Sequence, residues 1–210
     1  MESNYTSLLL VFTRNATLGR VKTRLAASIG DAEALKVHKA LMQQTIDQTS
    51  QCTCDKVVYY SDAIDANDLF SKNEFRQEVQ SGKELGARMQ GAFTAEFSHG
   101  YTSIVIIGTD CPELDEASIS LAFKQLEVSD VVVGPALDGG YYLLGLSAMH
   151  NELFEGIAWS TSSVLSETIQ IAERLSLSMA FTPEKRDIDT FEDLTSSNFG
   201  RVHFPHLVDQ

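Results

Sequence analysis

The sequence predicts an α/β fold: a single-domain, Rossmann-like three-layer αβα sandwich with a mainly parallel central sheet. Short apolar runs alternate with amphipathic segments of ten or more residues along nearly all of the 210 residues. A hydrophobic fraction of 43% with only 4 Pro and 13 Gly argues against a long disordered linker. We therefore expect residues 1–210 to form one domain whose ligand site lies beyond the carboxyl ends of the strands.

The first half of the chain begins with a buried strand. Residues 7–13 form a continuous apolar run, which is typical of a strand covered on both faces. Across residues 31–49 apolar side chains recur at three- and four-residue steps, which predicts a helix with Asp31 as its N-cap. The same reasoning predicts a strand at residues 56–60, a short helix at 65–72 and a helix at 84–97 with Leu85, Met89, Ala92, Phe93 and Phe97 pointing inward.

The second half continues the alternation. The predicted strands are residues 103–108, 130–135, 141–146 and 178–182, and the predicted helices are 115–126, 162–175 and a short one after Asp189. Gly139 and Gly140 separate two of these strands by a short turn. We therefore expect these two strands, 130–135 and 141–146, to pair as neighbours.

Net charge and apolar run length exclude several classes of protein. The formal net charge of −13 argues against binding nucleic acid or an anionic membrane, since both need basic surfaces. No apolar run approaches the roughly 20 residues of a membrane span, and the first residues lack the pattern of a signal peptide. Three cysteines are a sparse, odd set, and Cys52 and Cys54 receive no function. We expect a cytoplasmic protein; the sequence does not indicate its oligomeric state.

A basic segment follows the first predicted strand. Residues 3–30 contain no Asp or Glu but hold Arg14, Arg20, Lys22 and Arg24. Arginine offers forked donors to phosphate oxygens and lysine a compact charge, so such a loop can hold a diphosphate. It has neither the Walker pattern nor the dinucleotide-binding glycines. A small anionic ligand or a merely solvated basic loop would both explain it.

A carboxylate follows the strand predicted at residues 103–108. Asp110 is placed to hold Mg²⁺ or Mn²⁺, which prefer oxygen ligands, or to cap a following turn together with Glu113. Cys111 is a weaker candidate as a nucleophile, because no histidine lies near it in the sequence. Spacing alone does not decide between a metal ligand and a cap at Asp110.

Two further acidic motifs follow predicted strands. Asp138 precedes Gly139 and Gly140, which either let the backbone approach a ligand or simply form a tight turn. Asp187 and Asp189 alternate, so in an extended backbone both point to one side and can complete a metal site with Asp110. Asp189 and Glu192 also have the spacing of a helix start, which makes Asp187 the better metal ligand.

Taken together, these motifs resemble a bacterial family of glycosyltransferase-like proteins that includes the radical-SAM and selenodomain-associated transferases. The resemblance rests on Phe12-x-Arg14, Gly19-Arg20-Val21-Lys22-Thr23-Arg24-Leu25, Leu85-Gly86-x-Arg88-Met89, Gly108-Thr109-Asp110-Cys111-Pro112, Gly134-Pro135-x-x-Asp138-Gly139-Gly140-Tyr141-Tyr142, Trp159-Ser160-Thr161 and Asp187-Ile188-Asp189-Thr190. It implies a nucleotide-diphospho-sugar transferase fold of the glycosyltransferase A type. Phospholactate guanylyltransferases and molybdenum-cofactor nucleotidyltransferases are distantly similar.

The resemblance also implies roles for individual residues. Asp110, with Asp187 or Asp189, would hold Mg²⁺ or Mn²⁺, and Lys22, Arg24 and Asp110 would take part in catalysis. The residues expected to bind the nucleotide are Arg14, Arg20, Lys22, Arg24, Arg88, Asp138, Gly139 and Gly140. Two features depart from the family pattern: the loop lacks prolines before Gly19, and Phe191 stands where a proline usually follows.

Three functions remain open from the sequence. The first is a metal-dependent transferase that uses a nucleotide-sugar and an acceptor, with release of a nucleoside diphosphate. The second is a nucleotidyltransferase that attacks the α-phosphate of a nucleoside triphosphate and releases pyrophosphate. The third is a non-catalytic nucleotide-binding or interaction module. Substituting Asp110 would separate the catalytic functions from the third.

Overall fold

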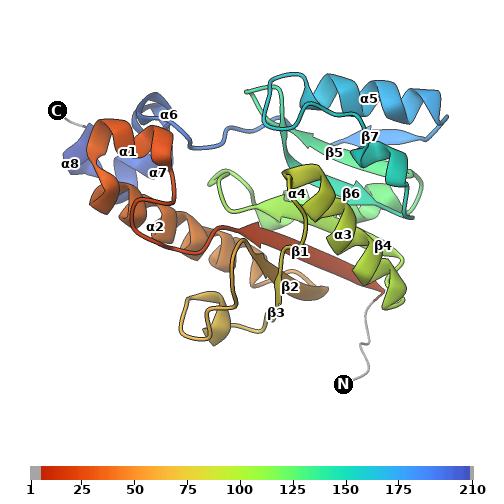
Figure 1. The fold of residues 1–210 in the computed structure, drawn as a ribbon, viewed down its shortest axis with the longest axis horizontal. Helices are drawn as coiled ribbons and strands as arrows, with labels where there is room; N and C mark the ends of the chain where they lie inside the picture. The colour runs from red at the N-terminus through yellow and green to blue at the C-terminus, as the bar shows by residue number, and fades with distance from the viewer. Residues whose placement is uncertain (1–5, 209–210) are drawn as a thin grey trace.

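A seven-stranded sheet runs through the protein, a computed structural model of which describes residues 6–208 (Figure 1). The strand order is β3-β2-β1-β4-β6-β5-β7. The strands are β1 Ser7–Thr13, β2 Asp55–Tyr60, β3 Arg76–Val79, β4 Ser103–Gly108, β5 Val131–Pro135, β6 Tyr141–Leu146 and β7 Met179–Phe181. The predicted α/β class and the alternation of strands and helices are confirmed.

The sheet is parallel except at one strand. β1 pairs in parallel with β2 and β4, β2 with β3, and β5 with β7. β6 runs antiparallel to both β4 and β5, and the expected pairing of β5 with β6 is confirmed. Because β6 runs the other way, its first residues lie at the same edge as the carboxyl ends of β1, β2 and β4.

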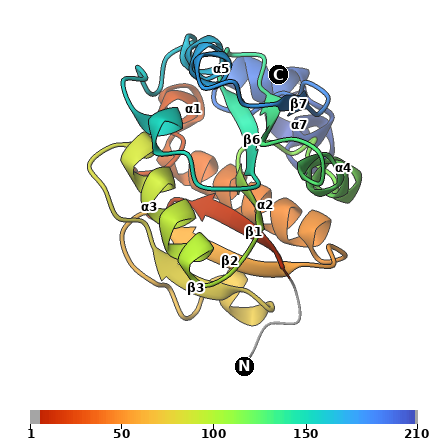
Figure 2. The same ribbon diagram turned by 90° about the vertical axis from the view of Figure 1, so that its right-hand side faces the viewer.

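Helices cover both faces of the sheet. They are α1 Thr23–Ile29, α2 Asp31–Thr49, α3 Leu85–Ser98, α4 Glu116–Leu126, α5 Val164–Arg174, α6 Phe191–Ser196, α7 Asn198–His203 and α8 Pro205–Val208, with 3₁₀ turns at Phe70–Lys72 and Asn151–Phe154. Figure 2 shows α3 and α4 on opposite sides of the strands. The structure therefore has the three layers that the sequence predicts.

The pleat of the central strands builds a separate core on each face. On β1, Leu9 and Val11 pack with α2 and α4, whereas Leu8 and Leu10 pack with α3 and α5. Successive side chains on a strand point to opposite faces, so a strand buried on both sides must be apolar throughout. This explains the continuous apolar run of β1.

The C-terminal helices close the molecule beside α1. In Figure 1, α6, α7 and α8 gather with α1 at one end of α2. A third cluster of buried residues joins Leu25 of α1 to Val37 and Leu41 of α2 and to Leu194 and Phe199. This packing fixes the segment that carries residues 187–189 against the loop that follows β1. In the part of the chain that the structure describes, no helix is both long and apolar enough to cross a membrane.

The structure corrects the expected caps of two helices. α2 begins after Gly30, which has φ 81° and is the N-cap, so the predicted capping role of Asp31 is wrong. At α6 the N-cap is Thr190, whose side chain pairs reciprocally with Asp193 in a capping box. The helix start predicted at Asp189 with Glu192 is therefore one residue too early, and Asp189 is free for other contacts.

The structure differs from the sequence prediction at three more places between residues 65 and 85. Residues 65–72 are not a helix apart from the 3₁₀ turn Phe70–Lys72, because the Asp68 side chain accepts from the backbone N–H of Ser71 and holds a turn instead. β3 was not predicted, since its sequence Arg-Gln-Glu-Val has no apolar run. Leu85 was expected to point inward but is 42% exposed.

Candidate functional site

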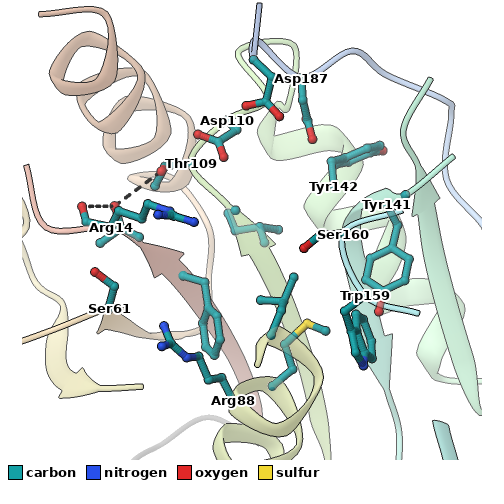
Figure 3. Close-up of a pocket in the computed structure, with 18 of the residues that line it drawn as sticks. Arg14, Ser61, Arg88, Thr109, Asp110, Tyr141, Tyr142, Trp159, Ser160 and Asp187 are labelled. Atoms are coloured by element: carbon teal, nitrogen blue, oxygen red, sulfur yellow. Dashed lines mark hydrogen bonds between the residues drawn. The ribbon is translucent and has the colours of Figure 1, made fainter. Parts of the chain in front are cut away.

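One cavity of about 980 Å³ opens at the edge of the sheet where β1, β2 and β4 end (Figure 3). Phe12 of β1 pairs with Tyr59 of β2 and with Gly108 of β4, so the loops after these strands leave the sheet at one level. Arg14, Ser61 and Thr109 lie on one side, and Tyr141, Trp159 and Ser160 lie opposite. Nearly all the predicted site residues line this cavity: Arg14, Arg20, Lys22, Arg24, Arg88, Asp110, Asp138, Gly140, Asp187 and Asp189.

The arginines that follow β1 are largely exposed at the cavity: Arg14 and Arg20 lie in the loop, and Arg24 lies in the first turn of α1. The side chain of Arg20 is 69% exposed and lies 3.8 Å from Asp62, and that of Arg24 is 71% exposed and lies 3.9 Å from Asp189. Ion pairs this long and this exposed contribute little stability. Both guanidinium groups can therefore exchange these partners for an anionic ligand.

Lys22 is held differently from the arginines. Its backbone has the left-handed conformation (φ 47°, ψ 46°) at the N-cap of α1, and its side chain is only 4% exposed. The ammonium Nζ donates to Asp110 Oδ1 at 2.6 Å, to Asp189 Oδ1 at 3.2 Å and to the Ile188 carbonyl at 2.5 Å. A direct contact between Lys22 and a phosphate stays a prediction, and it would require one of these contacts to be given up.

The contact between Lys22 and Asp110 determines their ionisation. Burial alone would raise the pKa of Asp110, but the Lys22 ammonium outweighs it and the pKa lies below its usual value. Burial alone would lower the pKa of Lys22, but Asp110 and Asp189 hold its pKa above the usual value. Both groups are therefore charged at neutral pH.

Asp187 lies beside Asp110 at one end of the cavity (Figure 3). Its Oδ1 is buried and has no hydrogen-bond partner among the residues that the structure describes. Burial, and then repulsion from Asp110, raises the pKa of Asp187 to about 7. A buried carboxylate without a donor is costly, which distinguishes Asp187 from a carboxylate that only caps a turn.

The carboxylates at this end of the cavity fit a hard divalent cation. Mg²⁺ and Mn²⁺ prefer oxygen ligands, and Mg²⁺ takes one or two protein carboxylates together with water and phosphate oxygens. Asp110 and Asp187 supply two carboxylates, and Asp187 has an oxygen that lacks a hydrogen-bond partner in the described part of the chain. Within residues 6–208 no three His, Cys, Asp or Glu side chains form a complete metal-binding group. The donor set therefore suits a substrate-bridging ion better than a structural one.

Side chains that the sequence did not single out hold the loop after β1 in place. His38 of α2 is buried, and its Nε2 hydrogen bonds to the carbonyl of Arg14 at 3.0 Å. Asn15 accepts from the backbone N–H of Asp62 and donates to the carbonyl of Ala63. His38 therefore fixes the backbone that carries Arg14.

The opposite wall is built from the β5–β6 turn and residues 159–162. Asp138 accepts from the backbone N–H of Gly140, and both line the cavity. Gly139 does not line it: with φ 88°, it lies where an added Cβ would be 2.2 Å from the Ser162 carbonyl oxygen. The structure thus gives Gly139 a packing role, in agreement with the tight-turn interpretation, and a ligand contact at Gly139 stays a prediction.

Two other residues at the cavity behave as packing groups. Trp159 lies so close to Gly86 that a Cβ there would be 2.1 Å from the indole Nε1, so Gly86 makes room for the ring. Burial raises the pKa of the Cys111 thiol far above its usual range. A thiol in this state is a poor nucleophile, which argues against catalysis by Cys111.

Solved structures resemble this fold over nearly the whole chain. A candidate nucleotide-diphospho-sugar transferase from Desulfovibrio desulfuricans G20 has a TM-score of 0.86 and 28% identity, covering 97% of this chain and 94% of that one. A nucleotidyl transferase from Methanothermobacter has a TM-score of 0.62 and 14% identity, covering 96% and 98% of the two chains. The manganese complex of Rv0371c from Mycobacterium tuberculosis H37Rv has a TM-score of 0.57 and 12% identity, covering 97% and 98%. The last two show a shared fold.

No curated protein matches the chain. A protein-family model described as "Uncharacterized protein conserved in bacteria (DUF2064)" matches residues 44–161. The match spans more than half of the chain and includes β2, α3, β4, the Asp110 loop and the β5–β6 turn. The chain therefore belongs to the DUF2064 family.

Proposed function

We propose that this protein is a metal-dependent transferase that acts on a nucleotide-sugar. One observation carries the proposal: a single cavity of about 980 Å³ joins exposed arginines from the loop after β1 to the carboxylates Asp110, Asp187 and Asp189. Diphosphates need both positive donors and a bridging cation, and here the residues for each lie in one cavity. The similarity to the Desulfovibrio protein, at 28% identity, supports the same class of reaction.

The arginines are the phosphate-binding groups in this proposal. Arg14, Arg20 and Arg24 all line the cavity, and the ion pairs of Arg20 and Arg24 are long and exposed. Guanidinium groups form paired hydrogen bonds with phosphate oxygens. As the bond between the sugar C1 and the diphosphate oxygen breaks, these arginines stabilise the negative charge on the departing nucleoside diphosphate.

We propose Asp110, with Asp187 or Asp189, as the ligands of Mg²⁺ or Mn²⁺. When bound, such an ion neutralises charge on phosphate oxygens. Lys22 holds Asp110 and Asp189 in position through its contacts at 2.6 and 3.2 Å. The manganese complex of Rv0371c shows that a protein with a similar fold takes a divalent ion.

The opposite wall provides the place for the acceptor. Asp138, Gly140, Tyr141 and Trp159 line the cavity, and Figure 3 shows Tyr141 and Trp159 across from Arg14. An acceptor on this side faces the sugar carbon, whose bond to the new oxygen forms as its bond to the diphosphate breaks. Holding both partners in one cavity supplies much of the rate enhancement by orientation alone.

A second candidate function is nucleotidyl transfer. Four cationic residues follow β1 in its loop and in the first turn of α1, and they are enough to bind the three phosphates of a nucleoside triphosphate: Arg14, Arg20, Lys22 and Arg24. In that reaction the acceptor phosphate attacks the α-phosphorus and pyrophosphate leaves. The inositol-1-phosphate CTP transferase from T. maritima shares the fold, with a TM-score of 0.54 and 15% identity.

Product analysis separates these functions. The protein is incubated with Mn²⁺ and either nucleotide-sugars or nucleoside triphosphates, and the released products are identified. We expect a nucleoside diphosphate from a nucleotide-sugar, and we expect Asp110→Asn to reduce its formation by about a hundredfold or more. Glu173→Gln, which removes an exposed carboxylate on α5, serves as the control.

The other outcomes are equally informative. Pyrophosphate release from a triphosphate would replace the first function by the second. Full activity in Asp110→Asn would contradict the assignment of Asp110. No product from any nucleotide, in a protein that still binds one, would indicate a non-catalytic binding module.

A further inference from the structure

Arg88 is held over the cavity by contacts that fix its orientation. Its Nε donates to the Gly82 carbonyl at 3.0 Å, and its Nη1 donates to Gln80 Oε1 at 3.3 Å. Gln80 is fixed in turn, because its Nε2 donates to the carbonyls of Thr13 and Tyr59 at 3.2 and 2.9 Å. The guanidinium thus rests on a chain of hydrogen bonds that ends on the backbone of β1 and β2.

The helix that carries Arg88, α3, is anchored to β2 and β3. Glu96 of α3 is fully buried, accepts from the Tyr59 hydroxyl at 2.6 Å and forms an ion pair with Arg76 of β3. An ion pair that is buried on one side and also hydrogen bonded resists displacement, since breaking it leaves a buried charge. Arg88 is therefore a preorganised group on a rigid helix.

The donors that Arg88 has left are directed at a ligand. An arginine has five N–H donors, and the contacts with Gly82 and Gln80 use two of them. The other three have no protein partner among the described residues, and Arg88 lines the cavity on the side of Arg14 and Ser61 (Figure 3). The structure thus presents a fork of donors on the side of the phosphate-binding loop, across from the proposed acceptor wall.

The surroundings of Arg88 suit a flat heterocycle. Phe12, Met89 and Leu85 line the cavity, and Leu85 is 42% exposed there although its predicted position was inward. An exposed leucine on a cavity wall offers an apolar face to a ring. Two carboxylates, Asp62 and Glu84, also line the cavity, and a carboxylate can accept from ring N–H groups.

We propose that this part of the cavity reads the base of the nucleotide and that Arg88 selects guanine. The proposal rests on the proposed nucleotide-dependent function. A guanidinium pairs with two neighbouring acceptors, and guanine presents O6 and N7 side by side. Adenine places an amino donor beside its N7, and uracil has a ring N–H between its two carbonyl oxygens. Cytosine has two neighbouring acceptors, O2 and N3, but it has no ring N–H to donate to a carboxylate. The carboxylates of Asp62 and Glu84 match the N1–H and N2 amino group that guanine alone combines with these acceptors.

The test compares the binding of GDP, IDP, ADP, UDP and CDP by titration calorimetry in the presence of Mg²⁺. We expect GDP to bind at least about tenfold more tightly than ADP, UDP or CDP. IDP keeps O6 and N7 but lacks the N2 amino group, so it should retain most of the advantage of GDP over ADP. Arg88→Lys should lose about tenfold or more for GDP and IDP and change ADP binding little.

Controls distinguish a loss of base recognition from a loss of folding or of positive charge. Arg88→Lys keeps the charge, and its melting temperature shows whether the fold is intact. Arg174→Lys, an exposed arginine in the last turn of α5, should leave every affinity unchanged. Tightest binding of any base other than guanine, or an equal loss for all nucleotides in Arg88→Lys, would overturn the assignment. Absence of binding by every nucleotide would instead refute the proposed function itself.

Discussion

At the scale of single residues, the cavity separates two kinds of acidic group. Asp110 is paired with Lys22 at 2.6 Å and keeps its charge. Asp187 has a buried oxygen with no hydrogen-bond partner in residues 6–208, and its pKa is raised to about 7. A carboxylate held in this state costs stability when it ionises. A bound cation would remove the cost, so Asp187 is the residue whose behaviour reports most directly on metal binding.

Asp187→Asn should stabilise the metal-free protein above neutral pH. The raised pKa means that Asp187 contributes its full stability below about pH 4, the pKa of an aspartate in an unfolded chain, and loses it as pH rises through about 7. Asparagine does not ionise, so the advantage of the variant should grow over this range to about 1–2 kcal/mol. Denaturant unfolding with a chelator, from pH 4 to 8, measures this.

The same variant should lose its response to metal. Adding Mn²⁺ with a nucleotide should stabilise the wild type and leave Asp187→Asn unchanged, because one ligand is missing. Equal pH dependence of the two proteins would show that Asp187 does not carry the buried charge. An undiminished response to metal would assign the second ligand to Asp189 instead.

At the scale of elements, the loop at residues 159–162 depends on the turn between β5 and β6. The Gly139 carbonyl accepts from the backbone N–H of Leu165, and the Gly139 Cα lies against the Ser162 carbonyl. Two segments that form the wall across from the arginines thus share one close backbone contact. A glycine is required there both for its positive φ and for its lack of a side chain.

Gly139→Ala should therefore be far more costly than an alanine at another positive-φ glycine. Gly156 has φ 73° but no atom within 4 Å of an added Cβ, so Gly156→Ala should cost only about 1 kcal/mol for its backbone conformation. At Gly139 the backbone must also move, and we expect a total of about 3 kcal/mol or more. Equal melting temperatures for the two variants would refute the close contact.

Elements with a strong periodic pattern could be predicted from the sequence. The predicted bounds of α2, β4 and β6 agree with the structure because their apolar residues face a core on one or both sides. β3 was missed because it is an edge strand of mixed polar residues. Residues 65–72 were expected to be helical, but Asp68 hydrogen bonds to nearby groups and forms a turn. The position of β3 at the edge of the sheet and the local hydrogen bonds of Asp68 explain these two differences between prediction and structure.

At the scale of the whole molecule, the topology brings distant segments to one edge of the sheet. Lys22, Asp110 and Asp189 are far apart in the sequence, yet the Lys22 ammonium contacts both carboxylates. The rule that ligands bind beyond the carboxyl ends of strands was enough to predict this grouping. It was not enough to find Gln80 or His38, because their roles come from single hydrogen bonds that only the packed structure reveals.

The central claim is that the cavity binds a nucleotide together with a divalent ion. Its most direct test is thermal unfolding of the wild type with nucleotides and nucleotide-sugars, with and without Mn²⁺ or Mg²⁺. At about 100 times the dissociation constant, a ligand adds about 2.7 kcal/mol, which should raise the melting temperature by about 5–10 °C. We predict such a rise for a nucleotide-sugar only when the ion is present. A cooperative melting transition that no nucleotide shifts, with or without the ion, would contradict the claim.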